Sequence, residues 1–232
     1  MTLNPTKIEW CTRTWNPVTG CQHGCSFCYA RKIATRFSGT KAFPNGFAPT
    51  FHPERLGDPY KEKKPQTIFV VSMGDLFGSW VPQKWIDRVV DSCLAAQQHT
   101  YIFLTKNPAK MLSVLRKWQV QKNWWLGYSA GQDEKSWDGF FPMRELKNKG
   151  WHTFVSAEPL LKYSDEALLD IDWIIVGMMT NPLTPCKDDV LTELLCDASG
   201  YCVPIFMKDS VRQAFPDIEM QRQFPEGIHV QK

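Results

Sequence analysis

Several features that define other classes of protein are missing from this sequence of 232 residues. No run of about 18 apolar residues occurs, so no segment is predicted to span a membrane. The first ten residues, MTLNPTKIEW, lack the apolar core of a secretory signal peptide, which predicts a cytoplasmic protein. A strong net charge is also missing, because 27 basic and 24 acidic residues leave only +3. With 43% apolar residues, this balance excludes a disordered chain and predicts one domain over residues 1–232.

Short apolar runs alternate with stretches of helical periodicity along most of the chain. The runs are rich in β-branched and aromatic residues, as is typical of strands buried on both faces, and cover residues 67–72, 100–105, 124–129, 153–156, 173–176 and 203–207. A further short strand is expected at 14–20. Apolar residues recur with helical spacing over residues 82–98, 108–118 and 188–198. This alternation predicts an α/β fold with a parallel sheet.

The length of the chain favours an incomplete barrel over a full one. An eight-fold barrel takes about 250 residues. Here residues 29–66 contain no predicted strand and include a long proline- and glycine-rich stretch. We therefore predict an incomplete (β/α)6 TIM-like barrel, with a lid-like insertion at about 37–66 and a C-terminal extension at about 209–232. A doubly wound open sheet is the alternative, although the chain has no G-x-G-x-x-G fingerprint.

The eight cysteines are the feature that composition does not explain. A disulfide framework is disfavoured in a chain of this length without a secretion signal. Cys21, Cys25 and Cys28 are spaced as C-x3-C-x2-C, in the expected loop between the first strand and the following helix. Three such thiols suit a [4Fe–4S] cluster with one open iron. A zinc site completed by His23, or three unrelated buried thiols, are the alternatives.

This triplet, with the aromatic Phe27 before its last cysteine, resembles the signature of the radical S-adenosylmethionine (SAM) superfamily. A closer resemblance is to a phage- and prophage-associated, radical-SAM-like family of unknown function. It extends from Ile8 to about Lys208 and rests on IEW…TWNPVTGC…CSFCYA, SMGDLF, FLTKNP, WLGYSA and FVSAEPLL.

The resemblance implies a mechanism and a set of ligands. Cys21, Cys25 and Cys28 would hold the [4Fe–4S] cluster, and the open iron would bind SAM. One electron would cleave SAM to a 5′-deoxyadenosyl radical, which abstracts a hydrogen atom from the substrate. The electron would come from a donor such as a flavodoxin or a ferredoxin.

Other residues at the ends of the expected strands are candidates for binding the cofactor. In the superfamily, small residues and an acid after the second strand contact the methionine amine of SAM, and Ser72, Gly74 and Asp75 match that place. Asp75 could instead cap a helix. The remaining candidates, each with a structural salt bridge, cap or core role as its alternative, are Phe27, Lys106, Ser129 and Glu158.

The catalytic residue stays open among Tyr29, Cys186, Cys196 and Cys202. The last three and Cys11 could equally be core or surface thiols, whereas Cys93 lies on the apolar face of a predicted helix and is expected in the core.

The substrate is expected to be a nucleic acid or a nucleotide, in base repair or modification. Aromatic residues between Phe37 and Tyr60 lie among cations, a combination that suits base stacking and phosphate contact. A small metabolite or a peptide is the alternative substrate, and a non-enzymatic, metal-stabilised binding module is the alternative function. The sequence does not indicate an oligomeric state.

Overall fold

The computed structural model describes residues 3–180 and 182–230, which divide into two compact units. Unit 1 is Met1–Val114 with His229–Lys232, and unit 2 is Leu115–Ile228. The last two residues of the predicted C-terminal extension, 231–232, lie outside the described part. The single domain over 1–232 stays a prediction.

Unit 1 contains a sheet in the order β1-β2-β5-β6. Its strands are β1 (Asn4–Pro5), β2 (Arg13–Trp15), β5 (Thr67–Val70) and β6 (Thr100–Thr105). The pairs β2–β5 and β5–β6 are parallel, with Arg13 opposite Ile68 and Thr67 opposite Thr100, and β1 runs antiparallel to β2. All four residues of β5 are buried, because strands covered on both faces carry no solvent-facing side. A second, two-stranded sheet pairs β3 (Val18–Thr19) with β4 (Thr50–Phe51).

The helices of unit 1 follow its strands. They are α1 (Tyr29–Arg36), η1 (Pro53–Arg55), α2 (Asp58–Lys61), α3 (Gln83–Leu94) and α4 (Pro108–Leu115). Helix α3 buries Ile86, Val89, Val90 and Cys93, so the predicted core position of Cys93 is confirmed. Burial also raises the pKa of the Cys93 thiol well above its usual value.

The predicted insertion at 37–66 makes many contacts with the rest of unit 1. The indole Nε1 of Trp15 donates to the Arg55 carbonyl at 2.8 Å, and the Arg55 guanidinium donates to the Asn16 carbonyl at 2.9 Å. His52 is buried, donates its backbone N–H to Pro17, and pairs its Nε2 with Thr19 Oγ1 at 2.9 Å. These bonds fasten the second half of the insertion beside the strand β3, and its action as a lid stays a prediction.

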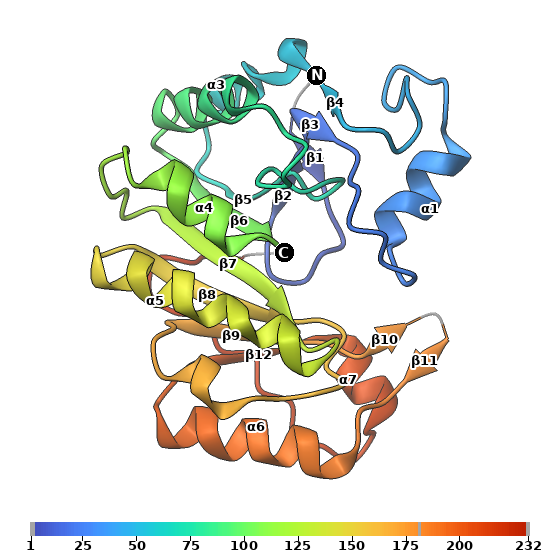
Figure 1. The fold of residues 1–232 in the computed structure, drawn as a ribbon, viewed down its shortest axis with the longest axis vertical. Helices are drawn as coiled ribbons and strands as arrows, with labels where there is room; N and C mark the ends of the chain where they lie inside the picture. The colour runs from blue at the N-terminus through green and yellow to red at the C-terminus, as the bar shows by residue number, and fades with distance from the viewer. Residues whose placement is uncertain (1–2, 181, 231–232) are drawn as a thin grey trace. The chain divides into compact units, whose positions relative to one another are not determined.

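Unit 2 contains four parallel strands in the order β7-β8-β9-β12. They are β7 (Trp124–Ala130), β8 (His152–Ala157), β9 (Trp173–Val176) and β12 (Ile205–Met207). The connections contain η2 (Glu134–Gly139), α5 (Phe140–Asn148), η3 (Asp165–Leu168), α6 (Asp188–Gly200) and the hairpin of β10 (Met179–Thr180) and β11 (Leu183–Thr184), and α7 (Asp209–Ala214) follows β12. Figure 1 shows this hairpin projecting beyond the end of β9.

Strand–helix alternation in both units confirms the predicted α/β fold with mostly parallel strands. The incomplete (β/α)6 barrel stays a prediction. No helix among the described residues is both long enough and apolar enough to cross a membrane.

Candidate functional site

The three clustered cysteines lie in a loop of unit 1 that joins β3 to α1, here called the cysteine loop (residues 21–28). All three thiols are partly exposed, and none forms a disulfide. Cys28 caps α1, because its Sγ accepts a hydrogen bond from the Arg31 N–H at 3.4 Å. The Cys28 N–H in turn donates to the Cys25 carbonyl at 3.4 Å.

Gly20 determines how the chain enters this loop. Its φ of +89° lies in the region that favours glycine, and a Cβ there would lie 2.3 Å from the Ala48 carbonyl oxygen. Its N–H donates to the Met73 carbonyl at 2.9 Å, and Gly20 forms a parallel bridge with Gly74. The cysteine loop therefore starts at a backbone contact with the segment after β5.

Burial raises the pKa of the Cys21 thiol to about 11. A backbone hydrogen bond from His23 opposes this shift, and the negative charges of Asp75, Cys25 and Cys28 add to it. Cys25 and Cys28 thus lie close enough to Cys21 to influence the ionisation of its thiol. Metal ligation by Cys21 would have to displace its proton, as is usual for a thiolate ligand.

The donor set of the loop, three thiols and one imidazole, has the chemistry that both a zinc ion and an iron–sulfur cluster can use. In the described ranges 3–180 and 182–230 no three His, Cys, Asp or Glu side chains are already arranged to hold a metal ion, and this includes the triplet. Nε2 of His23, the fourth ligand in the zinc alternative, donates to Asp75 instead. In a [4Fe–4S] cluster each thiolate binds a different iron, so three separate thiols of one loop can serve it.

Asp75 is the most heavily hydrogen-bonded acid beside the loop. It is 4% exposed. Its Oδ2 accepts from His23 Nε2 at 2.7 Å and from the Lys106 N–H at 2.9 Å. Its Oδ1 accepts from Thr105 Oγ1 at 2.7 Å and from the Phe77 N–H at 3.0 Å. Asp75 caps no helix, because α3 begins only at Gln83, so that alternative to a SAM contact is wrong.

Other predicted cofactor residues of unit 1 surround the same loop. Nζ of Lys106 lies 5.8 Å from the centre of the Phe27 ring. The buried Ser72 donates to Asn16 Oδ1 at 3.2 Å, and its carbonyl accepts from the Tyr29 hydroxyl at 2.7 Å. Gly74 faces Gly20, whose carbonyl oxygen would lie 2.8 Å from a Cβ on Gly74. Their roles in binding SAM stay predictions.

Two further polar residues of this region, Asn16 and Thr105, were not among the predicted site residues. Asn16 Oδ1 accepts from Ser72 Oγ and from the Met73 N–H, and Thr105 donates to Asp75. An asparagine before a proline at the end of a strand, as in the segment TWNP, was the only local signal for Asn16.

Unit 2 holds the other two predicted cofactor residues at the carboxyl ends of its strands. Glu158 accepts from Ser156 Oγ at 3.2 Å and from the Lys208 ammonium, and the ion pair passes close to Gly177, whose Cβ would lie 3.2 Å from both side chains. Ser129 Oγ accepts from the amide of Gln132 at 3.4 Å. Lys208, which the sequence analysis did not single out, is the cation of this cluster.

We expect Lys208→Met to lower the free energy of unfolding by about 1–3 kcal/mol, because it leaves the carboxylate of Glu158 without its cation. Urea unfolding would measure this loss. The double variant K208M/E158M should recover most of it, since replacing both partners of a shielded pair by apolar groups is close to neutral. Lys135→Met, at an exposed position, is the control. A free energy of unfolding of K208M equal to that of the parent chain would show that the ion pair contributes nothing to stability.

The remaining cysteines form no group with the triplet among the described residues. Cys11 and Cys186 are buried, and burial raises the pKa of Cys186 to about 11. Cys196 and Cys202 are exposed. A catalytic role for Tyr29, Cys186, Cys196 or Cys202 stays a prediction.

Comparison with known proteins gives a family and a fold. A family model described as "Protein of unknown function (DUF5131)" matches residues 5–213. No curated protein matches the chain. The fold is similar to that of spore photoproduct lyase complexed with dinucleoside spore photoproduct, with a TM-score of 0.50 and 11% identity over 95% of this chain and 65% of that chain.

A second similar fold is that of SuiB from Streptococcus suis bound to the precursor peptide SuiA. The TM-score is 0.56, with 14% identity over 90% of this chain and 52% of that one. Structures of both proteins are described with SAM: a double mutant of the lyase with bound AdoMet, at a TM-score of 0.50, and SuiB bound to S-adenosylmethionine, also at 0.50. The chain thus spans between half and two thirds of these proteins. At such low identities the likeness is one of fold.

Proposed function

The chain belongs to the family described as "Protein of unknown function (DUF5131)", and we propose that this member is a radical SAM enzyme. The observation that carries the proposal is the cysteine loop, with three partly exposed thiols, none in a disulfide, within eight residues between β3 and α1. The likeness in fold to proteins described with bound SAM supports it.

Cys21, Cys25 and Cys28 would hold a [4Fe–4S] cluster in this proposal. The bound cluster would supply the electron that cleaves SAM to a 5′-deoxyadenosyl radical for hydrogen abstraction from the substrate. Phe27 and Lys106, whose ring centre and Nζ lie 5.8 Å apart, would bind the aromatic and the anionic groups of SAM. Further proposed contacts with SAM are made by Ser72, Gly74, Asp75, Ser129 and Glu158.

The direct test is anaerobic loading of the purified chain with iron and sulfide, followed by SAM and a chemical reductant. The proposal expects about four irons per chain and release of 5′-deoxyadenosine, measured by chromatography. Zinc without iron or sulfide would support the metal-stabilised binding module instead. A cluster that releases no 5′-deoxyadenosine would reduce the proposal to electron transfer.

A nucleic acid is the substrate class that we propose for this site. Residues 10–53 contain no aspartate or glutamate, but they contain Arg13, Arg31, Lys32, Arg36 and Lys41. Helix α1 begins directly after Cys28 and exposes Tyr29 and Ile33, and its C-cap residue Phe37 is exposed as well, with exposed fractions of 50%, 40% and 47%. Exposed aromatic rings among cations suit the stacking of bases and the binding of phosphates.

We expect single-stranded DNA to bind in a salt-dependent way, and the double variant K32A/R36A to weaken this binding. Each phosphate contact contributes about 0.7 to the slope of log K against log salt for single strands, so the slope should fall by about 1.4. Fluorescence anisotropy between 50 and 200 mM salt (roughly the range over which such contacts weaken) would measure it. The variant K122A/K135A removes the same charge from unit 2 and should bind as the parent chain does. Absence of binding even at low salt would point to a small metabolite or a peptide.

We also propose that the protein is cytoplasmic and receives its electron from a flavodoxin or a ferredoxin. We propose that its strands form an incomplete (β/α)6 barrel.

A further inference from the structure

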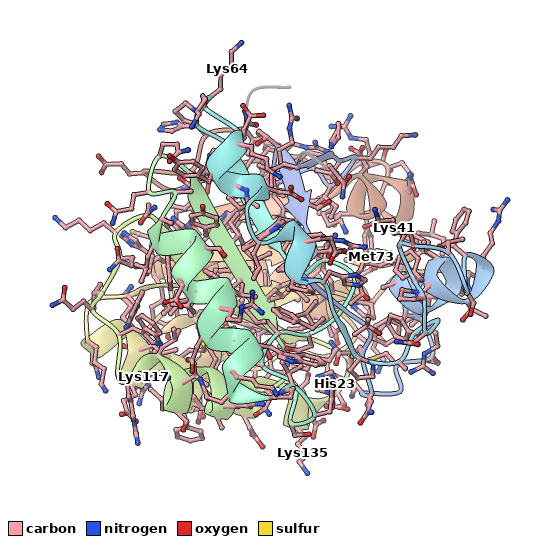
Figure 2. All side chains as sticks on the ribbon, turned by 90° about the horizontal axis from the view of Figure 1, so that it is seen from above. His23, Lys41, Lys64, Met73, Lys117 and Lys135 are labelled. Atoms are coloured by element: carbon pink, nitrogen blue, oxygen red, sulfur yellow. The ribbon has the colours of Figure 1, made fainter. Side chains whose placement is uncertain are left out.

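The segment Ser72–Asp75 contacts the cysteine loop at both ends. Before Cys25, the Nε2 of His23 donates to Asp75 Oδ2 at 2.7 Å, and the His23 ring lies edge-on to Trp80 with 4.8 Å between ring centres. Immediately after Cys28, the hydroxyl of Tyr29 donates to the Ser72 carbonyl at 2.7 Å. Figure 2 labels His23 and also Met73, which lies in the middle of this segment.

The same segment is itself held firmly by three neighbouring parts of unit 1. Asn16 at the end of β2 accepts from the Met73 N–H and from Ser72 Oγ. Gly20 donates its N–H to the Met73 carbonyl. Asp75 accepts from Thr105 and from the Lys106 N–H at the end of β6. The segment therefore offers a fixed support. By contrast, the cysteine loop has one described backbone–backbone hydrogen bond between its own residues, from the Cys28 N–H to the Cys25 carbonyl.

We infer that the two contacts, His23–Asp75 and Tyr29–Ser72, form a clamp that sets the position of Cys25 and Cys28 before any cluster binds. His23 and Tyr29 are then positioning residues, and Tyr29 acts by holding the start of α1. The inference rests on the proposed function for what the loop holds. The contacts themselves belong to the chain without its cluster and can be tested there.

The variants His23→Ala, Tyr29→Phe and their combination test the clamp. Each single variant removes one contact of the clamp, and Asp75 keeps three donors in H23A, so the chain should fold with its midpoint of thermal unfolding lowered by only about 3–6 °C. The metal-free chain should show hydrogen exchange in residues 24–32 that is about tenfold faster for each lost bond, the effect of roughly 1.4 kcal/mol. The loaded chain should lose iron to a chelator faster by a similar factor, and the double variant should exceed both single ones.

Matched controls separate positioning from general loosening. His229→Ala removes an exposed imidazole, and Tyr60→Phe removes the hydroxyl of a tyrosine that is 61% exposed; both should exchange as the parent chain does. His23→Gln keeps an N–H donor at the place of Nε2 and should restore slow exchange and slow loss of iron. Exchange at the parent rate in H23A/Y29F would overturn the clamp. A chain that binds no iron but exchanges faster in these variants would keep the clamp and refute the proposed cluster.

Discussion

Replacing Cys21, Cys25 and Cys28 together by serine is expected to abolish the binding of iron and sulfide. The loaded chain should fall from about four irons to nearly none, and release of 5′-deoxyadenosine should fall below detection. The physical reason is that a serine hydroxyl stays protonated where a thiol can give the thiolate that iron requires. Iron and sulfide analysis, together with the visible absorption of the cluster, would measure the change.

The fold of the triple variant should survive, because all three side chains are partly exposed and lie outside the core. Cys196→Ser is the matched control, since it changes an exposed thiol on α6 of unit 2 and should leave the iron content unaltered. Iron retained by the triple variant would contradict the assignment. The cluster would then have to be sought at Cys186, Cys196 and Cys202.

The strands could be predicted wherever both faces of the strand are buried. Residues 100–105 and 173–176 form β6 and β9 with the predicted bounds, because continuous apolar runs leave little choice of structure. The first strand was harder. It divides into β2 and β3 around Asn16 and Pro17, since proline cannot donate to a neighbouring strand.

A helix was expected after the cysteine loop, but the bounds of α1 were not predicted. Among its eight residues only Ala30 and Ala34 are buried, whereas α3 buries four residues at helical spacing. With only eight residues, α1 offers about two turns in which a periodic pattern can be recognised, whereas α3 offers more than three.

In the candidate site too, features close together in the sequence could be predicted, and contacts between distant segments could not. The cysteine spacing is local and could be read directly. The partners of Asp75 could not, because His23 lies 52 positions away in the chain and Thr105 lies 30 positions away. Lys208 and Glu158 are 50 positions apart, and their pairing depends on β8 and β12 ending near Gly177. Such contacts follow from the parallel order of strands, which no single segment encodes.

The second large effect is expected at Asp75. Asp75→Ala should lower the free energy of unfolding by about 3–5 kcal/mol, because each buried donor left without an acceptor costs roughly 1–3 kcal/mol and the individual costs are not additive. Four donors lose their acceptor, from His23, Phe77, Thr105 and Lys106. Urea unfolding would measure the loss, and Asp91→Ala, at an exposed position of α3, should change the stability by less than about 0.5 kcal/mol.

Asp75→Asn separates the structural role from the predicted contact with SAM. Asparagine keeps one oxygen for two of the four donors, so the variant should fold and lose about 1–3 kcal/mol. If Asp75 also accepts from the ammonium of SAM, the KM of Asp75→Asn for SAM should be well above the KM of His23→Ala, because His23→Ala leaves the carboxylate in place. Equal KM values in the two variants would assign Asp75 to support of the cysteine loop alone, because its carboxylate oxygens already accept from four donors of the protein.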